Sequence, residues 1–529
     1  MKMNKLKTLL VALLLSVCIV SLFAAGQSED LEGRGKTLVF GLEAEAPTLD
    51  IHVSPNVYEI AQYLGGSLFI KDAETGEYLP YLAESWSVTP DGMVYEFTLR
   101  DDIYFHDGSK LTAQDYAWTF NRAVSVPVQS TAGATLLGMM KAEAVDDLTF
   151  KVTMAMPNST LKDVLSRPTY HQPLSQSAVE ASGQDYGRNP VGVGPFVFKE
   201  WITGSRLVLE KNPDYSWGPE GAPAEGPDIE AIEYRFIPEY STRLAGLESG
   251  EIDYLRLEDK DVARFQDDDN FQLFDRLDSG SGYTIIMNIT KAPFDDVRFR
   301  KALNYAVDRE ILVKVAAMGL AEPSYGPITR GTVGYWDGVE EIGYRYEPDK
   351  AAGLLEELGW TKGTDGILQK DGNQLSLVLD VMGGQTRSAE ILQQQFKAVG
   401  IDISLRQKEM AVLFTDLAKG DFQFALNRYG WIDYGLLFAM YHPQMIGNMN
   451  HTQQSQDEML NSLVGGAVFG PDEETINMTI VESQRRIVDQ AYSIPLYTSM
   501  FVYALNKRVK GVSEINAGMP VLFNASIAE

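Results

Sequence analysis

The stretch "TRSAEILQQQFKAVGIDISL", residues 386–405, places a helix pattern directly before a strand pattern. The helix pattern ends at Gly400, and every second residue of "IDISL" is then apolar, as in a half-buried strand. An earlier helix pattern, residues 348–359, also begins at a proline and ends at a glycine. Helices that end at a glycine and lead into strands are typical of layered domains with crossover connections, so we predict an α/β fold.

Length and charge limit what the protein can be. A chain of 529 residues is too long for one compact core, so we expect at least two domains. Hydrophobic residues make up 45% of the chain and aromatic residues 10%, which is typical of a folded globular protein. With 73 Asp+Glu against 45 Lys+Arg the net charge is −28, and such a surface repels phosphate backbones. We therefore expect no nucleic-acid partner.

The first 26 residues predict a secretory signal peptide. A lysine-rich start is followed by an apolar run at residues 9–23 and by the small residues Ala-Ala-Gly. The run is shorter than the roughly 20 residues that a bilayer span needs. Cys18 is the single cysteine, and Val17 stands before it where a lipoprotein signal has a small residue. We therefore expect residues 1–26 to be removed after export, and a lipid anchor through Cys18 is not favoured.

The segment "TLRDDIYFHDGSKLTAQD", residues 98–115, surrounds one of five histidines with acids and raises the question of a metal or catalytic site. An Asp-Gly turn dipeptide follows His106. Thr112 and Asp115 have the spacing of a capping box, in which the hydroxyl would accept a backbone N–H and the carboxylate would reach back to the cap. Because local turn and cap chemistry explains every residue, we interpret this cluster as architecture.

A search for catalytic motifs favours binding over catalysis. The sequence has no G-x-S-x-G elbow, no H-E-x-x-H, no phosphate-binding glycine loop and no dinucleotide fingerprint after a strand. His442 and His451 share a loop but have no third ligand at metal spacing, so we predict no metal site and no cofactor. A pair of carboxylates of the glycosidase kind leaves no sequence signature, so an extracytoplasmic hydrolase stays as an alternative.

A longer stretch around residues 98–115 carries a family resemblance. "YLPYLAESWSVTPDGMVYEFTLRDDIYFHDGSKLTAQD", residues 78–115, resembles the signature region of the extracytoplasmic solute-binding proteins of ABC importers. The branch in question takes up oligopeptides, dipeptides and nickel (bacterial solute-binding protein family 5). The resemblance continues in "NPVGVGPFVFKEW" and "APFDDVRFRKALNYAVDRE" and covers nearly all of the chain after the predicted signal peptide.

The resemblance implies a two-lobe periplasmic-binding-protein fold of the large type, with an extra subdomain in the first lobe. We expect the first lobe at residues 27–280 and the second at 281–496, with residues 497–529 returning to the first lobe. The lobes would close over a ligand like a clamp. Gly280 and Gly282 lie at the first crossing, where a glycine backbone can absorb the change that closure needs.

The resemblance also implies ligand-binding residues. Peptide binders of the family hold the ligand's amino terminus with an aspartate shortly after a Gly-Trp pair, although many of them have one more residue between tryptophan and aspartate than this chain. Here Asp433 would pair with the ammonium group, and Trp431 and Tyr434 would supply apolar contact area. The alternative is that Asp433 caps a turn and Trp431 fills the core. Arg387, in a shortened loop, is the nearest candidate for the arginine with which dipeptide binders hold the ligand's carboxylate.

These observations lead to three hypotheses about function. The first is an exported, monomeric receptor of an ABC importer that captures peptides and delivers them to permease subunits in the membrane. The second keeps the fold and replaces the peptide by an oligosaccharide, which Trp431 and the 25 tyrosines suit equally well. The third is the hydrolase. The nickel branch of the family would need a histidine in the cleft, and only His442 lies near enough in sequence.

Overall fold

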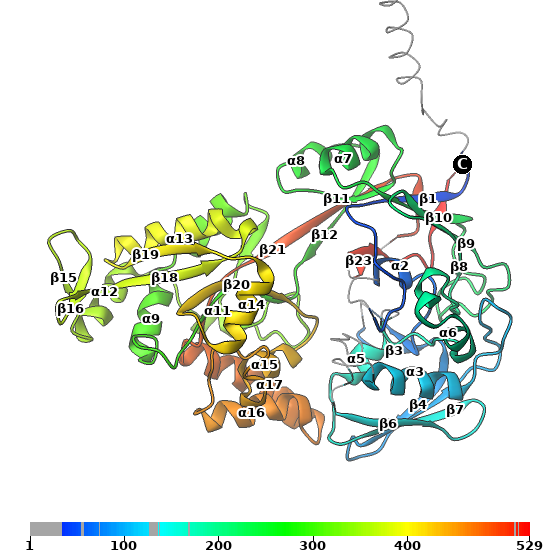
Figure 1. Cartoon of the computed structure of the whole chain (residues 1–529), viewed down its shortest axis with the longest axis horizontal. Helices are drawn as coiled ribbons and strands as arrows, with labels where there is room; N and C mark the ends of the chain where they lie inside the picture. The colour runs from blue at the N-terminus through cyan, green and yellow to red at the C-terminus, as the bar shows by residue number, and fades with distance from the viewer. Residues whose placement is uncertain are drawn as a thin grey trace, which may run out of the picture.

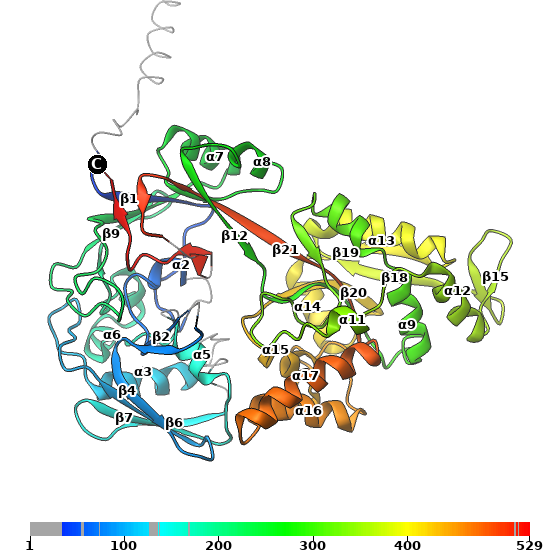
Figure 2. The ribbon, with the colours of Figure 1, turned by 180° about the vertical axis from the view of Figure 1, so that it is seen from behind.

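The computed structural model describes residues 34–528, except 54–57, 73–74, 126–135, 137, 168–169, 513–514 and 517. The predicted signal peptide at residues 1–26, with Cys18, lies outside the described residues. In the part that is described, no helix combines the length and the apolar character needed to cross a membrane. The chain forms two lobes (Figure 1), which Figure 2 shows from behind.

The main sheet of the first lobe is mixed. Its strands are β1 (Thr37–Leu42), β8 (Phe196–Ile202), β9 (Arg206–Lys211), β10 (Ala231–Phe236), β11 (Tyr254–Arg256), β12 (Phe271–Leu277) and the second half of β21 (Ser493–Asn506). β1 is parallel to β10 and β11, and β21 runs antiparallel to both β11 and β12. The carboxyl ends of β1, β11 and β12 therefore lie at one edge of the sheet. The helices α7 (Tyr240–Ser249) and α8 (Val262–Phe265) connect strands of this sheet.

A separate four-stranded antiparallel sheet forms a subdomain of the first lobe. Its order is β4 (Ala83–Val88), β5 (Val94–Leu99), β7 (Thr149–Met154) and β6 (Met139–Ala144), and α3 (Ala113–Ser125) packs on it. Aromatic residues dominate this core, with Phe97 and Phe150 stacked at 5.0 Å between ring centroids. Smaller elements lie around it: β2 (Phe69–Lys71), β3 (Tyr78–Pro80), α5 (Leu161–Leu165) and α6 (Gln176–Ser182).

The acid-rich segment at residues 98–115 is part of this subdomain and is structural. His106 is partly buried: its Nδ1 accepts the Gly192 N–H at 3.2 Å and its Nε2 donates to the Gly194 carbonyl at 3.1 Å. Burial lowers the pKa of His106 to about 4, so the ring is neutral. The helix cap differs in detail from the expected capping box. The Thr112 hydroxyl donates to Asp115 at 2.6 Å, and the same carboxylate accepts the Thr112 N–H at 3.0 Å.

The sheet of the second lobe has the order β19 (Asp402–Gln407), β18 (Ser376–Val381), β20 (Phe424–Gly430), β13 (Gly280–Met287) and the first half of β21, with which the short strand β14 (Ala321–Pro323) also pairs. Its longer helices are α9 (Val297–Tyr305), α12 (Pro348–Glu357), α13 (Thr386–Ala398), α14 (Met410–Lys419), α15 (Gly435–Tyr441), α16 (Glu458–Phe469) and α17 (Glu473–Asp489). α15, α16 and α17 pack together on the side of this lobe that faces the first lobe (Figures 1 and 2).

The stretch at residues 386–405 folds as its pattern predicts. α13 ends at Ala398, Gly400 takes a φ of +87°, and β19 begins at Asp402. Because β18 and β19 are parallel, α13 is the crossover between them. The predicted α/β class is confirmed.

The two lobes are joined by strands that cross between them. The first half of β21 pairs with β13 in the second lobe, and the second half pairs with β12 in the first. The chain thus crosses between Leu277 and Gly280 and returns within β21, close to Ser499. Gly280 has a φ of +118°, and a Cβ there would lie 1.9 Å from the Tyr429 carbonyl oxygen, so only glycine fits this crossing.

Candidate ligand-binding site

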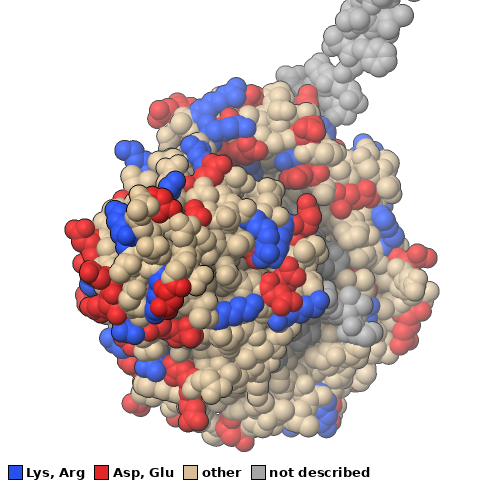
Figure 3. Space-filling model, turned by 60° about the vertical axis from the view of Figure 1, so that its left-hand side comes forward, with Lys and Arg blue, Asp and Glu red and all other residues tan. Residues whose placement is uncertain are grey.

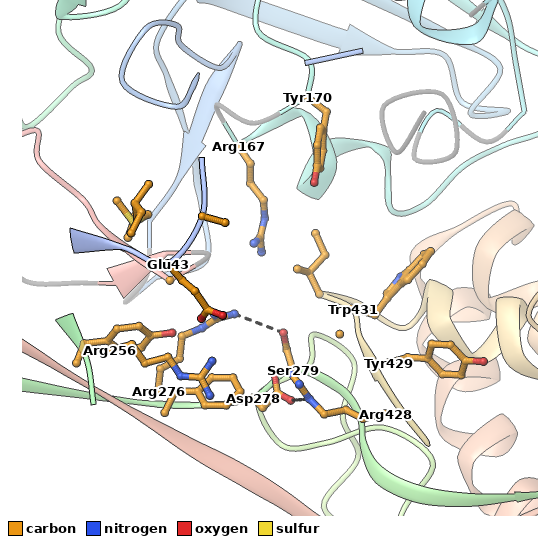
Figure 4. Close-up of a pocket in the computed structure, with 18 of the residues that line it drawn as sticks. Glu43, Arg167, Tyr170, Arg256, Arg276, Asp278, Ser279, Arg428, Tyr429 and Trp431 are labelled. Atoms are coloured by element: carbon orange, nitrogen blue, oxygen red, sulfur yellow. Dashed lines mark hydrogen bonds and ion pairs between the residues drawn. The ribbon is translucent and has the colours of Figure 1, made fainter. Parts of the chain in front are cut away.

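A cavity of about 1880 Å³ lies between the two lobes. The first lobe contributes the segment after β1, residues 42–47, and the region of α5 up to Tyr170. The second lobe contributes residues 428–433 and parts of α15, and the crossing strands close one end. In Figure 4, Arg167 and Tyr170 lie on one side of the cavity, and Trp431 and Tyr429 lie on the other. The position of the cavity, between two lobes joined by a hinge, is that of a ligand-binding cleft.

Asp433 is a buried carboxylate at the wall of this cavity. Its residue is 3% exposed, and its Oδ1 accepts the Trp431 Nε1–H at 3.1 Å and the Gly435 N–H at 2.8 Å. Among the described residues no cation lies within ion-pair distance of Asp433. Burial raises the pKa of its carboxyl to about 6, with the negative field of Asp163 as a smaller contribution in the same direction. A ligand cation at this point would compensate the cost of burying the charge.

The other residues expected around the ligand are placed differently. Trp431 lines the cavity, and its indole also bonds to Asp433. Tyr434 is 7% exposed and packs in the core of the second lobe, outside the set of described cavity residues. Arg387 is exposed in the first turn of α13 and does not line the cavity either. Ser388 and Ala389 take the inward positions of that turn, so Arg387 points to solvent. Of the four residues expected around the ligand, Asp433 and Trp431 line the cavity, and Tyr434 and Arg387 do not.

Several arginines that the sequence pattern did not single out gather at the hinge end. Arg256 ends β11, Arg276 lies near the end of β12, and Arg428 lies near the end of β20. All three line the cavity, and Arg428 is ion-paired to Asp278. Figure 4 shows these groups close together, opposite Arg167. They lie far apart in sequence, and only the shared edge of the strands brings them to one place.

An aromatic group forms a second wall of the cavity in the second lobe. The rings of Phe414, Tyr429 and His451 lie 5.8 to 6.2 Å apart between centroids, and the Tyr429 hydroxyl bonds to His451 Nδ1. Burial lowers the pKa of His451 to about 4, so this ring is an uncharged part of the wall. Such a surface offers apolar area to a ligand side chain.

The lobes also touch directly beside the cavity. The Ser159 N–H donates to the Val468 carbonyl at 3.0 Å, and its hydroxyl donates to the Ala467 carbonyl at 2.9 Å. Both acceptors belong to the last turn of α16, where helix carbonyls have no partner within the helix. Ser159 precedes α5 in the first lobe, so these two bonds hold the lobes together across the cleft.

Known proteins are similar to this chain in sequence and in fold. The chain is 31% identical to the glutathione-binding protein GsiB of Pectobacterium atrosepticum over 325 residues, which cover 61% of this chain and 60% of that protein. It is 27% identical to the oligopeptide-binding protein AppA of Bacillus subtilis over 439 residues, which cover 80% and 79% of the two chains. The crystal structure of NikA from Brucella suis in complex with Fe(III)-EDTA has the same fold, with a TM-score of 0.81 at 23% identity, covering 93% of this chain and 99% of that one. The two-lobe clamp fold is therefore confirmed.

A family model assigns the chain. The model of the bacterial extracellular solute-binding proteins, family 5, matches residues 77–445, which is more than two thirds of the sequence. Proteins of this family bind solutes outside the cytoplasm and are binding proteins, not enzymes. The chain belongs to the bacterial extracellular solute-binding proteins of family 5.

Proposed function

We propose that this protein is the substrate-binding component of an ABC importer that captures peptides between its lobes and delivers them to permease subunits in the membrane. The observation that carries the proposal is Asp433, a buried carboxylate that faces the cavity without a cation from the described chain. A peptide ammonium group at this position would supply the missing charge and hydrogen-bond donors. The oligopeptide- and glutathione-binding relatives agree with such a ligand.

The roles of the neighbouring residues follow from the same arrangement. Trp431 positions Asp433 through its indole N–H and presents its ring to the cavity. Phe414 and Tyr429 form an apolar wall for a ligand side chain. The cavity of about 1880 Å³ exceeds the ~1,000 Å³ upper range of drug-sized pockets, so it has room for a peptide of several residues.

Peptide binding is tested by titrating purified protein with peptide pools while its melting temperature is recorded. A peptide at ~100 times its dissociation constant stabilises the folded state by about 2.7 kcal/mol. Oligosaccharides, the alternative ligands, are screened side by side, with Asp433→Ala as the discriminating variant. Loss of peptide binding in this variant supports the proposal. Stabilisation by oligosaccharides alone, unchanged in Asp433→Ala, contradicts it.

We also propose that the protein is exported as a monomer after removal of residues 1–26, and that Cys18 leaves with them instead of carrying a lipid. In this proposal residues 27–280 and 497–529 form the first lobe, and residues 281–496 form the second. Amino-terminal sequencing of the protein recovered from outside the cytoplasm tests the export step. A mature chain that starts near residue 27 is expected, and a lipid-modified cysteine at its start would contradict the proposal.

A further inference from the structure

The charges inside the cavity differ from those of the whole chain. The chain has a net charge of −28, and acidic and basic side chains intermingle over the face shown in Figure 3. Among the described residues, the cavity has equal numbers of acidic and basic side chains. The acids are Glu43, Glu45, Glu258, Asp259, Asp278 and Asp433, and the bases are Arg167, Arg243, Arg256, Lys260, Arg276 and Arg428. The lining of the cavity is therefore less acidic than the chain as a whole.

Most of these acids already have a basic partner. The ion pairs are Glu43–Arg243 at 3.6 Å, Glu45–Arg188 at 3.5 Å, Glu258–Lys260 at 2.7 Å and Asp278–Arg428. Arg256 and Arg276 form no ion pair with any described residue. Asp259 lies within the electrostatic field of Arg256 but beyond ion-pair distance. Two guanidinium groups thus remain at the hinge end of the cavity without a carboxylate in contact.

Both guanidinium groups are held in place by other contacts. Arg256 lies over the ring of Phe501, 3.9 Å from its centroid, and Arg428 lies 5.3 Å from the same centroid. Arg276 donates from Nη2 to the Ser279 hydroxyl at 3.4 Å. Figure 4 shows Arg256 and Arg276 on the same side of the cavity as Ser279 and Asp278. Each guanidinium keeps N–H donors that no described acceptor uses.

This arrangement suits a planar anion on the ligand. A guanidinium group offers paired N–H donors that match the two oxygens of a carboxylate. The span from Arg428, at the hinge end, to Asp433 also fits a short peptide, because the two residues are five positions apart and their Cα atoms are at most ~18 Å apart. A ligand with an ammonium group at Asp433 can therefore place a carboxylate at the hinge end.

We propose that Arg256 and Arg276 form a carboxylate-binding subsite, and that the ligands are peptides whose carboxylate reaches it while their ammonium group occupies the Asp433 end. This inference rests on the proposed function. Phe501 and the Asp278–Arg428 pair form the wall that positions the subsite. The carboxylate can come from the carboxyl terminus of the peptide or from an acidic side chain, and the experiment separates these two sources.

The test is a competition experiment on the full chain. Purified protein is incubated with an equimolar library of tri- to pentapeptides, prepared as free acids and as carboxyl-terminal amides, and the retained peptides are quantified by mass spectrometry. Wild type should enrich free acids over amides roughly 10- to 100-fold, the effect expected for hydrogen bonds to a charged group. If the carboxylate comes from a side chain, amides that contain Glu should be enriched over their Gln counterparts by a similar factor.

Variants connect the preference to the two arginines. Arg256→Gln and Arg276→Gln should each reduce the preference for the carboxylate and leave retention of amides that lack acidic side chains unchanged. Arg256→Lys, which keeps the positive charge, should retain part of the preference. Arg387→Gln, in which an exposed arginine outside the cavity is changed in the same way, is the control and should behave as wild type. Circular dichroism and the melting temperature show whether each variant is folded.

The outcomes separate this inference from the proposed function. If wild type retains peptides but prefers neither free acids over amides nor Glu over Gln, the proposed carboxylate-binding subsite is contradicted. The proposed peptide-binding function is not affected by that result. The same conclusion follows if the preference persists in the folded double variant Arg256→Gln/Arg276→Gln. If wild type retains no peptide of any length, the proposed function itself is wrong.

Discussion

Two turns, one in each lobe, have an aspartate that accepts a backbone N–H from a residue two or three positions away. In the first lobe, Asp115 accepts from Thr112, and in the second, Asp433 accepts from Gly435. Asp115 also accepts the Thr112 hydroxyl, and it does not line the cavity between the lobes. Asp433 is buried, borders the cavity between the lobes and has a raised pKa. The comparison shows that similar local hydrogen bonding serves a helix end in one lobe and a candidate ligand site in the other.

The largest effect is expected from Asp433→Asn. The amide oxygen can still accept the N–H groups of Trp431 and Gly435, but the negative charge is lost. Removing one partner of a buried charge pair costs about 2–5 kcal/mol, so peptide affinity should fall roughly 30-fold or more. Isothermal titration calorimetry measures this loss. The melting temperature of the unliganded protein should not fall, because a buried charge without a partner has been removed. Unchanged peptide affinity would remove Asp433 from the site.

The second effect is a pH dependence that arises at the second-lobe turn. The pKa of Asp433 is raised by burial to about 6 in the unliganded protein, above the ordinary carboxyl value of 3.8. The stability that the protonated form contributes is full below pH ~4 and is lost as the pH rises through about 6. Peptide affinity should change in the opposite sense and decrease as the pH falls through about 6, by up to tenfold per pH unit.

A comparison with Asp433→Asn isolates this titration from that of other groups. The difference in the free energy of unfolding between wild type and variant, measured by urea denaturation from pH 4 to 8, should vary around pH 6. If that difference is the same at every pH, Asp433 keeps an ordinary pKa and the comparison of the two turns fails.

A smaller effect is expected in the first-lobe turn, and it should concern stability alone. Asp115→Ala removes the acceptor for both the N–H and the hydroxyl of Thr112 at the start of α3. Loss of a helix-terminal side-chain bond of this kind costs about 0.5–2 kcal/mol. Urea denaturation should show this decrease while calorimetry gives the wild-type peptide affinity. A variant that lost peptide affinity while keeping its stability would show that this turn takes part in binding.

The smallest effect is expected from Ser159→Ala, which changes the contact between the lobes. The variant loses the bond from the Ser159 hydroxyl to the Ala467 carbonyl and keeps the bond from its N–H. A typical net hydrogen bond contributes about 0.5–1.5 kcal/mol, so the closed form and the peptide affinity should weaken about 2- to 10-fold. Small-angle scattering with and without peptide reports closure. Ser205→Ala, at an exposed turn of the first lobe, serves as the control, and an equal loss in both variants would contradict a specific role for Ser159.

Local patterns predicted the features that depend on residues close in sequence. The α/β class followed from α13, Gly400 and β19, because a helix pattern, a stop and an alternating strand are all encoded within 20 residues. A structural role of His106 was also predicted, but the residues that hold its ring, Gly192 and Gly194, lie 86 and 88 positions away and come from the tertiary structure. The resemblance over residues 78–115 led to the family, which the match over residues 77–445 confirms. The role of Asp433 stays a prediction, although the structure places it at the cavity.

Sequence alone determined the fold class and the family of this protein, because periodicity, turn residues and motif order are local properties of the chain. Tertiary structure alone decided which side chains line the cavity. Arg256 and Arg276 meet near Arg428 because the strands that carry them end beside the cavity, more than 150 residues apart in sequence in the case of Arg276 and Arg428. Tertiary structure also decided that Tyr434 packs in the core and that Arg387 is exposed to solvent. These directions depend on strand pairing and helix orientation, which no short stretch of sequence encodes.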